Sequence, residues 1–270
     1  MTAKLRLGGM ALRNGLLVHG PTHWAAAVRR GDGSIAVASG VKPRMRGRVA
    51  AVPGARGVVR MGEAMLVIPL VKQALPEARL PWQDRRVLAA ILASGAGGAL
   101  LRRRLSGPAG EAAAATLSVL PSLIALRGGD LASYHGVEHK AIGAYESGAS
   151  DAREATKEHD RCGSHLMAPM LAANLAGTAL LRRAVAHPSP AAGAAVGLAS
   201  LGAAVEVFTW SERHADRATA RALRRPGHEL QRLVGTREPT ETQLEVGRAA
   251  LAEILRVEEP ARSGSEQPAP

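Results

Sequence analysis

Long apolar stretches dominate the middle of the chain, and clusters of arginine separate them. Four windows, 87–101, 112–126, 166–181 and 191–210, contain no Lys, Arg or Asp. A helix that crosses a bilayer needs roughly 20 apolar residues, and only the last window has that length. Arginines follow the first three windows directly, and their long side chains extend short spans by reaching the interface. Hydropathy alone leaves two interpretations open, membrane helices or the buried helices of a soluble Ala-rich bundle.

The first 60 residues have a different pattern, with short apolar runs between turn residues. The runs HWAAAV (23–28) and SIAVA (34–38) flank an Arg-Arg-Gly-Asp-Gly turn. This arrangement predicts a β-hairpin. We therefore expect a small β-rich region at 1–60. The run at 63–74 that follows predicts a short helix, which Pro69 would kink or interrupt.

The last 60 residues predict two further helices and a tail. Residues 211–227 form a basic helical pattern that Pro226 and Gly227 should stop. Residues 240–255 form an amphipathic pattern with Leu244, Leu251 and Leu255 on one face. The polar, Pro-rich residues 258–270 are expected to be a disordered tail. The helical membrane domain then spans 61–257, with a central loop at 127–165.

Charge and composition limit the kinds of molecule that the protein is expected to bind. The 270 residues carry a formal net charge of +12, only 2% are aromatic, and there is one cysteine. A basic chain fits nucleic acid or anionic lipid, or simply reflects an Arg-rich composition. The scarcity of aromatic stacking platforms argues against a nucleic-acid partner. A single cysteine cannot form an intramolecular disulfide and is consistent with a reducing compartment.

Loop charge predicts the orientation of the four windows. If all four cross the membrane, both termini and the 127–165 loop lie on one side. That side holds most of the Lys and Arg, so it is expected to be the cytoplasmic face of the inner membrane. The arginines at 102–104 fall on the opposite side and do not fit this topology.

The segment 134–140, YHGVEHK, places two histidines and a glutamate at helical spacing. His135 and His139 share one face of a helix, and Glu138 lies beside them. H-x-x-E-H is the inverse of the H-E-x-x-H zinc motif. Neutral imidazoles bind zinc or another divalent transition metal, and Glu138 would act as general base toward a water there. The alternative is a surface helix with two incidental histidines.

The segment 159–165, HDRCGSH, adds two candidate ligands. His159 and Cys162 have the short spacing of a ligand pair, and a thiolate favours zinc or iron over magnesium. With His135 and His139 they make a four-ligand His₃Cys set. Four protein ligands would close a structural site, whereas three ligands and a water would make a catalytic one. The spacing leaves both possibilities open.

Two glutamates are further candidates. Glu206 lies inside the window 191–210, where an acid is costly and usually has a partner or a function. It is expected either to complete the metal site or to face water near the end of a core helix. Glu146 is a candidate ligand or a hydrogen-bonding partner of a ligand histidine. No role is expected for His19.

Several segments, taken in order, resemble the YqhQ-like family of bacterial membrane proteins. Residues 134–148, YHGVEHKAIGAYESG, resemble the family pattern YHGAEHKTI-AYE-G, and HDRCGS resembles HPRCGT. The opening 8–33 resembles GGQAVMEGVMMRGP-WA-AVR--DG, and the closing 230–251 resembles L-TREP---QLEVA--AL. The resemblance runs from about residue 8 to residue 255.

The resemblance implies a multi-pass membrane protein that belongs to the predicted metal-dependent enzymes, without a settled reaction. It implies that the signature positions are His135, Glu138, His139, His159 and Cys162, and that Glu206 matches the acid of the last membrane helix. The chain departs from the family at Asn14, His19 and Asp160, which stand in place of Glu, Arg and Pro. The change at Asn14 weighs against a catalytic role for the N-terminal segment.

Together these observations predict a mainly α fold, a multi-pass membrane helical bundle with a small N-terminal β-rich region. The expected function is metal-assisted hydrolysis, with a peptide bond or a lipid-linked bond as the candidates. One alternative is a non-enzymatic membrane scaffold with a structural metal, whose basic cytoplasmic face recruits a protein partner or anionic lipid. The other is a soluble basic helical protein that binds nucleic acid.

Overall fold

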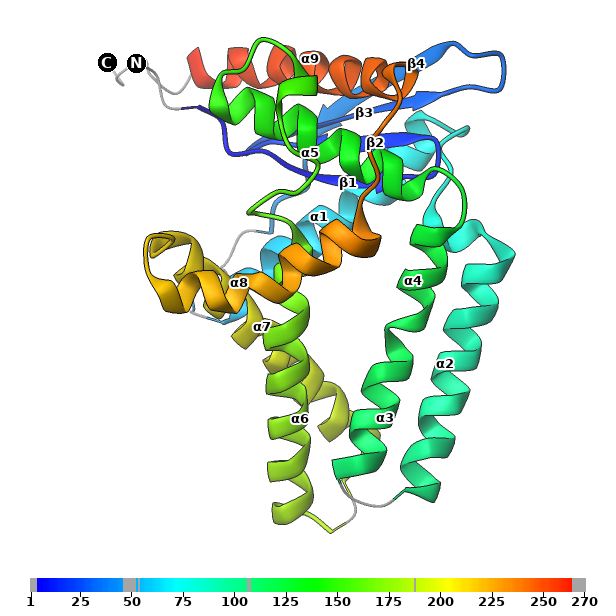
Figure 1. The fold of residues 1–270 in the computed structure, drawn as a ribbon, viewed down its shortest axis with the longest axis vertical. Coiled ribbons are helices and arrows are strands. Elements are labelled where there is room, and N and C mark those ends of the chain that lie inside the picture. Colours follow the sequence, from blue (N-terminus) through cyan, green and yellow to red (C-terminus); the bar gives the residue numbers. More distant parts are fainter. Residues whose placement is uncertain (1–3, 46–51, 53, 106–107, 187, 264–270) are drawn as a thin grey trace.

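The computed structural model describes residues 4–45, 52, 54–105, 108–186 and 188–263. The described chain is mainly helical and has one small sheet near its N-terminus, as the sequence predicts. Figure 1 shows two parts. The head contains the sheet and the helices α1 (Ala55–Ala74), α5 (Leu131–Ser147) and α9 (Glu241–Ser263). The stem consists of long helices that extend away from the head.

The sheet is an antiparallel meander of four strands in sequence order. The strands are β1 (Gly8–Leu12), β2 (Gly15–His19), β3 (His23–Arg29) and β4 (Ile35–Val41). The predicted hairpin is β3–β4, in which Ala27 pairs with Val37. The strands β1 and β2 were not predicted.

Helices cover both faces of the sheet. Leu16 and Val18 pack into a core with residues of α5 and α9, whereas Leu17 and Trp24 pack into a second core with α1. Successive side chains of a strand point to opposite faces. Strands buried on both faces therefore read as continuous apolar runs without alternation.

The prediction of a disordered tail from residue 258 is wrong for its first six residues, because they belong to helix α9. The helix continues through Ser263, so residues 258–263 are helical, and residues 264–270 lie outside the described residues. The reason is Glu258, whose side chain is buried at the β2–β3 turn. Its carboxylate accepts hydrogen bonds from the backbone N–H groups of Thr22 and His23, at 2.7 Å each, and from the Thr22 hydroxyl. These bonds hold the helix end against the sheet.

The stem is built from two helical hairpins that leave the head in the same direction (Figure 1). The first consists of α2 (Arg85–Arg104), α3 (Pro108–Ser118) and α4 (Leu120–Arg127), and the second of α6 (Met167–Ala184) and α7 (Pro190–Arg213). Near the far end, Glu111 accepts hydrogen bonds from Arg102 (3.0 Å) and Arg182 (2.7 Å). Glu111 thereby joins the hairpins and partly neutralises the arginines that the predicted topology did not accommodate.

Three stretches of the stem are long and apolar enough to cross a membrane: Ala109–Arg127, Gly163–Ala184 and Pro190–Arg213. Only 17%, 6% and 17% of their most apolar windows are buried within the protein, so most of this apolar surface faces outward. They contain three of the four predicted windows. Helix α2, which holds the window 87–101, does not meet the same criterion.

Candidate metal centre

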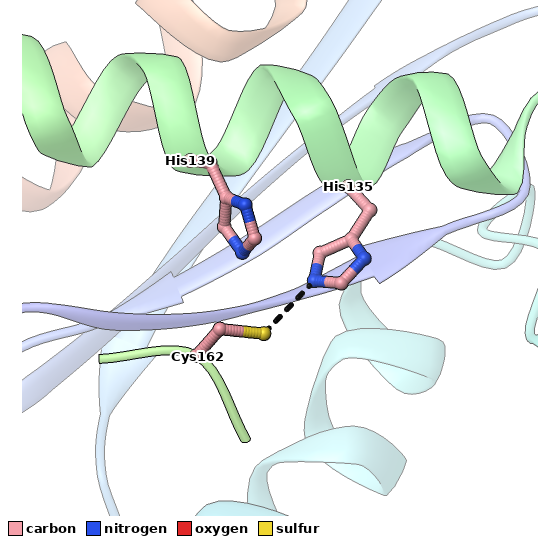
Figure 2. A group of neighbouring side chains, drawn as sticks. All are labelled: His135, His139 and Cys162. Carbon is pink, nitrogen blue, oxygen red and sulfur yellow. Dashed lines mark hydrogen bonds between the residues drawn. The ribbon is translucent and has the colours of Figure 1, made fainter. Parts of the chain in front are cut away.

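Helix α5 and the loop before α6 bring three potential ligands together. His135 and His139 lie one turn apart on α5, and Cys162 faces them from the loop (Figure 2). One ligand atom from each residue lies within 4.8 Å of the others. The His135 Nε2 and Cys162 Sγ atoms are 3.4 Å apart. The predicted pairing of the two sequence motifs is therefore present in the fold.

Backbone carbonyls orient both imidazoles. The Nδ1 of His135 lies 2.8 Å from the carbonyl oxygen of Gly235, and the Nδ1 of His139 lies 2.6 Å from that of Lys157. A carbonyl only accepts, so each Nδ1 carries the proton and donates it. The Nε2 atom of each ring then faces the cluster (Figure 2), which is the arrangement of a histidine that binds a metal.

His139 provides the sharpest indication of a missing partner. Its side chain is 1% exposed, and its Nε2 has no hydrogen-bond partner among the described residues. A buried polar atom without a partner is destabilising, and native proteins rarely leave one. Burial, followed by the charge of His135, lowers the pKa of His139 to about 2, so this nitrogen offers a lone pair rather than a proton.

Cys162 supplies the third potential ligand. Burial raises the pKa of its thiol, and the Ser164 N–H and hydroxyl groups counter only part of that effect. The thiol is therefore protonated unless a cation lies beside it. A divalent metal ion displaces such a proton, so the soft sulfur and two imidazoles form a donor set that fits zinc or a similar transition metal.

Glu138, the predicted general base, lines a cavity of about 460 Å³ together with His135 and Cys162. Its carboxyl group lies against Gly9 of β1. Burial raises the pKa of Glu138 to about 7, and the charge of His135 opposes this rise. A carboxyl group with this pKa exchanges protons near neutral pH, as a general base requires.

His159 lies beside the cluster rather than within it. Its Nε2 is 3.1 Å from Glu146 Oε2, and its Nδ1 accepts a hydrogen bond from the Arg161 N–H at 3.3 Å. Its ring centroid is 5.6 Å from that of His139. Both nitrogens are thus engaged, and Glu146, which also pairs with Arg161, is the hydrogen-bonding partner of His159. Of the four predicted ligands, three lie together as potential ligands, and His159 is their neighbour.

Glu206 belongs to α7, and its carboxylate lies at the start of α1. Its Oε1 accepts a hydrogen bond from the Gly54 N–H at 2.8 Å, so its carboxylate lies at the positive end of that helix. It is not among the three clustered residues.

A buried glutamine that the sequence did not single out positions the loop. Gln231 begins the π-helical turn Gln231–Gly235, which follows α8 (Ala218–Leu230) without a break at Pro226. The Gln231 Oε1 accepts from the His159 N–H at 2.7 Å, and its Nε2 donates to the Ser164 hydroxyl at 2.8 Å. The same turn supplies the Gly235 carbonyl that orients His135. π-Helical turns of this kind are frequent at functional sites.

Comparison with known proteins finds one family model that matches part of the chain. Residues 130–257 match the family described as "Protein of unknown function (DUF1385)". The match includes the H-x-x-E-H helix, the His-x-x-Cys loop and the π-helical turn. No curated protein and no solved structure matches the chain.

Proposed function

We propose that the protein is an integral membrane protein whose stem crosses the bilayer and whose head carries a transition-metal site. Three stretches of the stem are long and apolar enough for this, and most of their surface faces outward. In water this surface would be an exposed hydrophobic patch far larger than soluble monomers tolerate. In a bilayer it would face lipid chains.

We further propose that His135, His139 and Cys162 hold zinc or a similar divalent ion in a hydrolytic site. The observation that carries this proposal is the buried Nε2 of His139, which has no partner among the described residues and lies in a cluster with two other ligand atoms. Three protein ligands and an open position are typical of catalytic zinc, which acts as a Lewis acid. His159 with both nitrogens engaged favours this count over four.

The chain's own residues supply the proton transfers of a hydrolysis. Glu138 takes a proton from a water in the cavity as the water oxygen bonds to the electrophilic carbon or phosphorus. The bond to the leaving group then breaks, and Glu138 returns the proton to the leaving group. Arg161 also lines the cavity and would balance negative charge there.

Metal content of the detergent-purified protein tests the site. Wild type should contain about one transition-metal ion per chain, and the His135→Ala/His139→Ala variant should contain almost none. His214→Ala, at the residue that directly follows α7, is the matched control and should keep its metal. Circular dichroism checks that each variant is folded. Wild type free of metal after purification without chelators would overturn the proposal.

X-ray absorption separates a catalytic site from the scaffold alternative. Three protein ligands and one exchangeable light atom are expected for the hydrolase. A closed shell of four protein ligands that includes His159 would support a structural metal in a membrane scaffold instead.

A further inference from the structure

Three cavities meet at one residue where the head joins the stem. Pro81 lines the metal cavity, a cavity of about 340 Å³ beside the head ends of α2 and α4, and a groove of about 490 Å³ between α2 and α3–α4. The metal cavity and the second cavity also share Leu131, and the second cavity and the groove share Val87 and Ala125. The three cavities are therefore neighbours, and they follow one another from the metal centre to the stem.

The second cavity is basic. Arg13, Arg86 and Arg127 line it together with a single acid, Asp84, which pairs with Arg13 at 2.9 Å. In the described part of the chain, Arg86 and Arg127 have no acidic partner. Guanidinium groups match the oxygens of a phosphate in charge and geometry. We call this space the arginine cavity.

The groove is apolar and lined mainly by small side chains. Gly95 and Gly98 of α2 and Ala114 of α3 leave it open, and Ile91 contributes to its wall. Ser94 lines the same groove, is 8% exposed, and its Oγ has no hydrogen-bond partner among the described residues. This hydroxyl needs an acceptor from whatever fills the groove, and the ester carbonyl of a lipid chain supplies one.

We propose that these two spaces bind an anionic amphiphile, with its phosphate head group in the arginine cavity and one hydrocarbon chain in the groove. The three spaces suit such a molecule in polarity and in order. The apolar groove lies in the stem, the arginine cavity lies at its head end, and the metal cavity lies beside the arginine cavity. The inference deepens the proposed function, because it names the substrate class of the metal site as a phospholipid-like molecule. The binding itself does not depend on the metal.

Photo-crosslinking of the full chain tests the groove. The probe is a phosphatidic acid with a diazirine in one acyl chain, and the labelled peptides are identified by mass spectrometry. Wild type should be labelled on α2 and on α3–α4. Gly95→Leu should reduce this labelling about tenfold or more, because no atom lies within 4 Å of the new Cβ and the larger side chain fills the groove without disturbing the fold. Ala96→Leu, exposed and outside the groove lining, is the matched control and should leave labelling unchanged.

A second set of variants, labelled with two lipid probes, tests whether the arginine cavity recognises the phosphate head group. Arg86→Gln with Arg127→Gln should lower phosphatidic acid labelling about tenfold or more, since charge-assisted hydrogen bonds are lost. Labelling by a diacylglycerol probe with the same chain should not change. Arg103→Gln with Arg104→Gln, at the far end of the stem, is the control. Millimolar inorganic phosphate should not compete, which distinguishes a lipid site from a site for free phosphate.

Failure of this inference and failure of the metal site give different results. Labelling is compared in wild type and in the metal-free His135→Ala/His139→Ala variant, and equal groove labelling in both supports the amphiphile site whether or not the metal is catalytic. Labelling that Gly95→Leu leaves intact, or an equal loss for both head-group probes, would overturn it.

Discussion

Gly9 of β1 lies directly against the carboxyl group of Glu138 on α5. A Cβ atom placed on Gly9 would stand 2.8 Å from Glu138 Oε1, closer than real Cβ contacts occur. The strand therefore forms one wall of the pocket for Glu138, and only glycine leaves room for the carboxyl group in its observed position. Glu138 points into the same cavity as His135 and Cys162.

Gly9→Ala should displace Glu138 and leave the three potential ligands in place. A shift of the base by about 1 Å costs on the order of 100-fold in turnover, so hydrolysis should fall by that amount while the metal content stays that of wild type. The paired assay is turnover and metal content on the same preparation. Gly31→Ala, where nothing lies within 4 Å of the added Cβ, serves as control. Full turnover in Gly9→Ala would mean that Glu138 is not the base.

Gln231→Ala should weaken metal binding without removing a ligand. Gln231 bonds to both ends of the segment that carries Cys162, through the His159 N–H and the Ser164 hydroxyl. Loss of such outer contacts typically costs about 10- to 100-fold in metal affinity. Competition with a chromogenic chelator measures this change. Gln73→Ala, exposed on α1, should bind metal like wild type.

The sequence predicted the kind of chemistry at the site better than the exact set of residues that form it. The spacing of His135 and His139 required only a helix, and the structure brings Cys162 to the same face from 23 residues farther along the chain. Glu146 was a candidate partner of a histidine, but no local pattern could show that this histidine is His159. Nor could a local pattern show that the Glu206 carboxylate lies at the start of α1, because that contact depends on how distant helices pack. Gln231 carried no signal, since a single glutamine near a basic helix is ordinary.

The fold was predictable where its pattern is local. The β3–β4 hairpin and the apolar windows follow from turn chemistry and hydropathy. The strand β2 does not follow from such a pattern, because burial on both faces of the sheet removes the alternation of polar and apolar residues. The last turns of α9 do not follow either, because a polar, Pro-containing segment resembles a disordered tail. Glu258 explains the second error, as its three hydrogen bonds to Thr22 and His23 are long-range contacts.

Glu258→Ala should destabilise the head strongly. The carboxylate is 1% exposed, and its removal leaves the N–H groups of Thr22 and His23 without acceptors. Hydrogen bonds to charged groups contribute about 1.5–3 kcal/mol each, so we expect a loss of about 3 kcal/mol in the free energy of unfolding. Thermal unfolding of the detergent-solubilised protein measures it. Glu245→Ala, on the same helix as Glu258, breaks an ion pair with Arg29 of β3 and should cost less than about 1 kcal/mol. Equal losses in both variants would contradict the role of Glu258.

Acid should destabilise the head through His19. Burial, with a smaller effect of Lys42, lowers the pKa of His19 to about 4 from 6.5. Between these two values the unfolded chain binds a proton that the folded chain does not, so stability falls as the pH drops from about 6.5 to 4. Protonation of His19 lowers the free energy of unfolding by at most about 3 kcal/mol. The free energy of unfolding of His19→Gln, measured over this range, should therefore decline less steeply than that of wild type. Parallel curves would show that His19 does not remain neutral.

The far ends of the two stem hairpins should lie on the opposite side of the membrane from the head. Helix α7 has 24 residues and is about 36 Å long, enough to cross a hydrocarbon core of about 30 Å. Most of the positive charge lies outside the stem helices, so we expect the head to be on the cytoplasmic side. Leu105→Cys and Val185→Cys, both at exposed positions of the far end, should react with a membrane-impermeant maleimide added to intact cells.

Asp32→Cys, in the exposed β3–β4 turn, is the matched position in the head and should react only after the cells are permeabilised. Wild type, with Cys162 as its single cysteine, gives the background. The pairing of Arg102 and Arg182 with Glu111 lowers the charge that must cross the bilayer during insertion, so the arginines at the far end do not oppose this orientation. Labelling of Asp32→Cys in intact cells would place the head outside, and labelling of neither end before permeabilisation would mean that the stem does not cross the membrane.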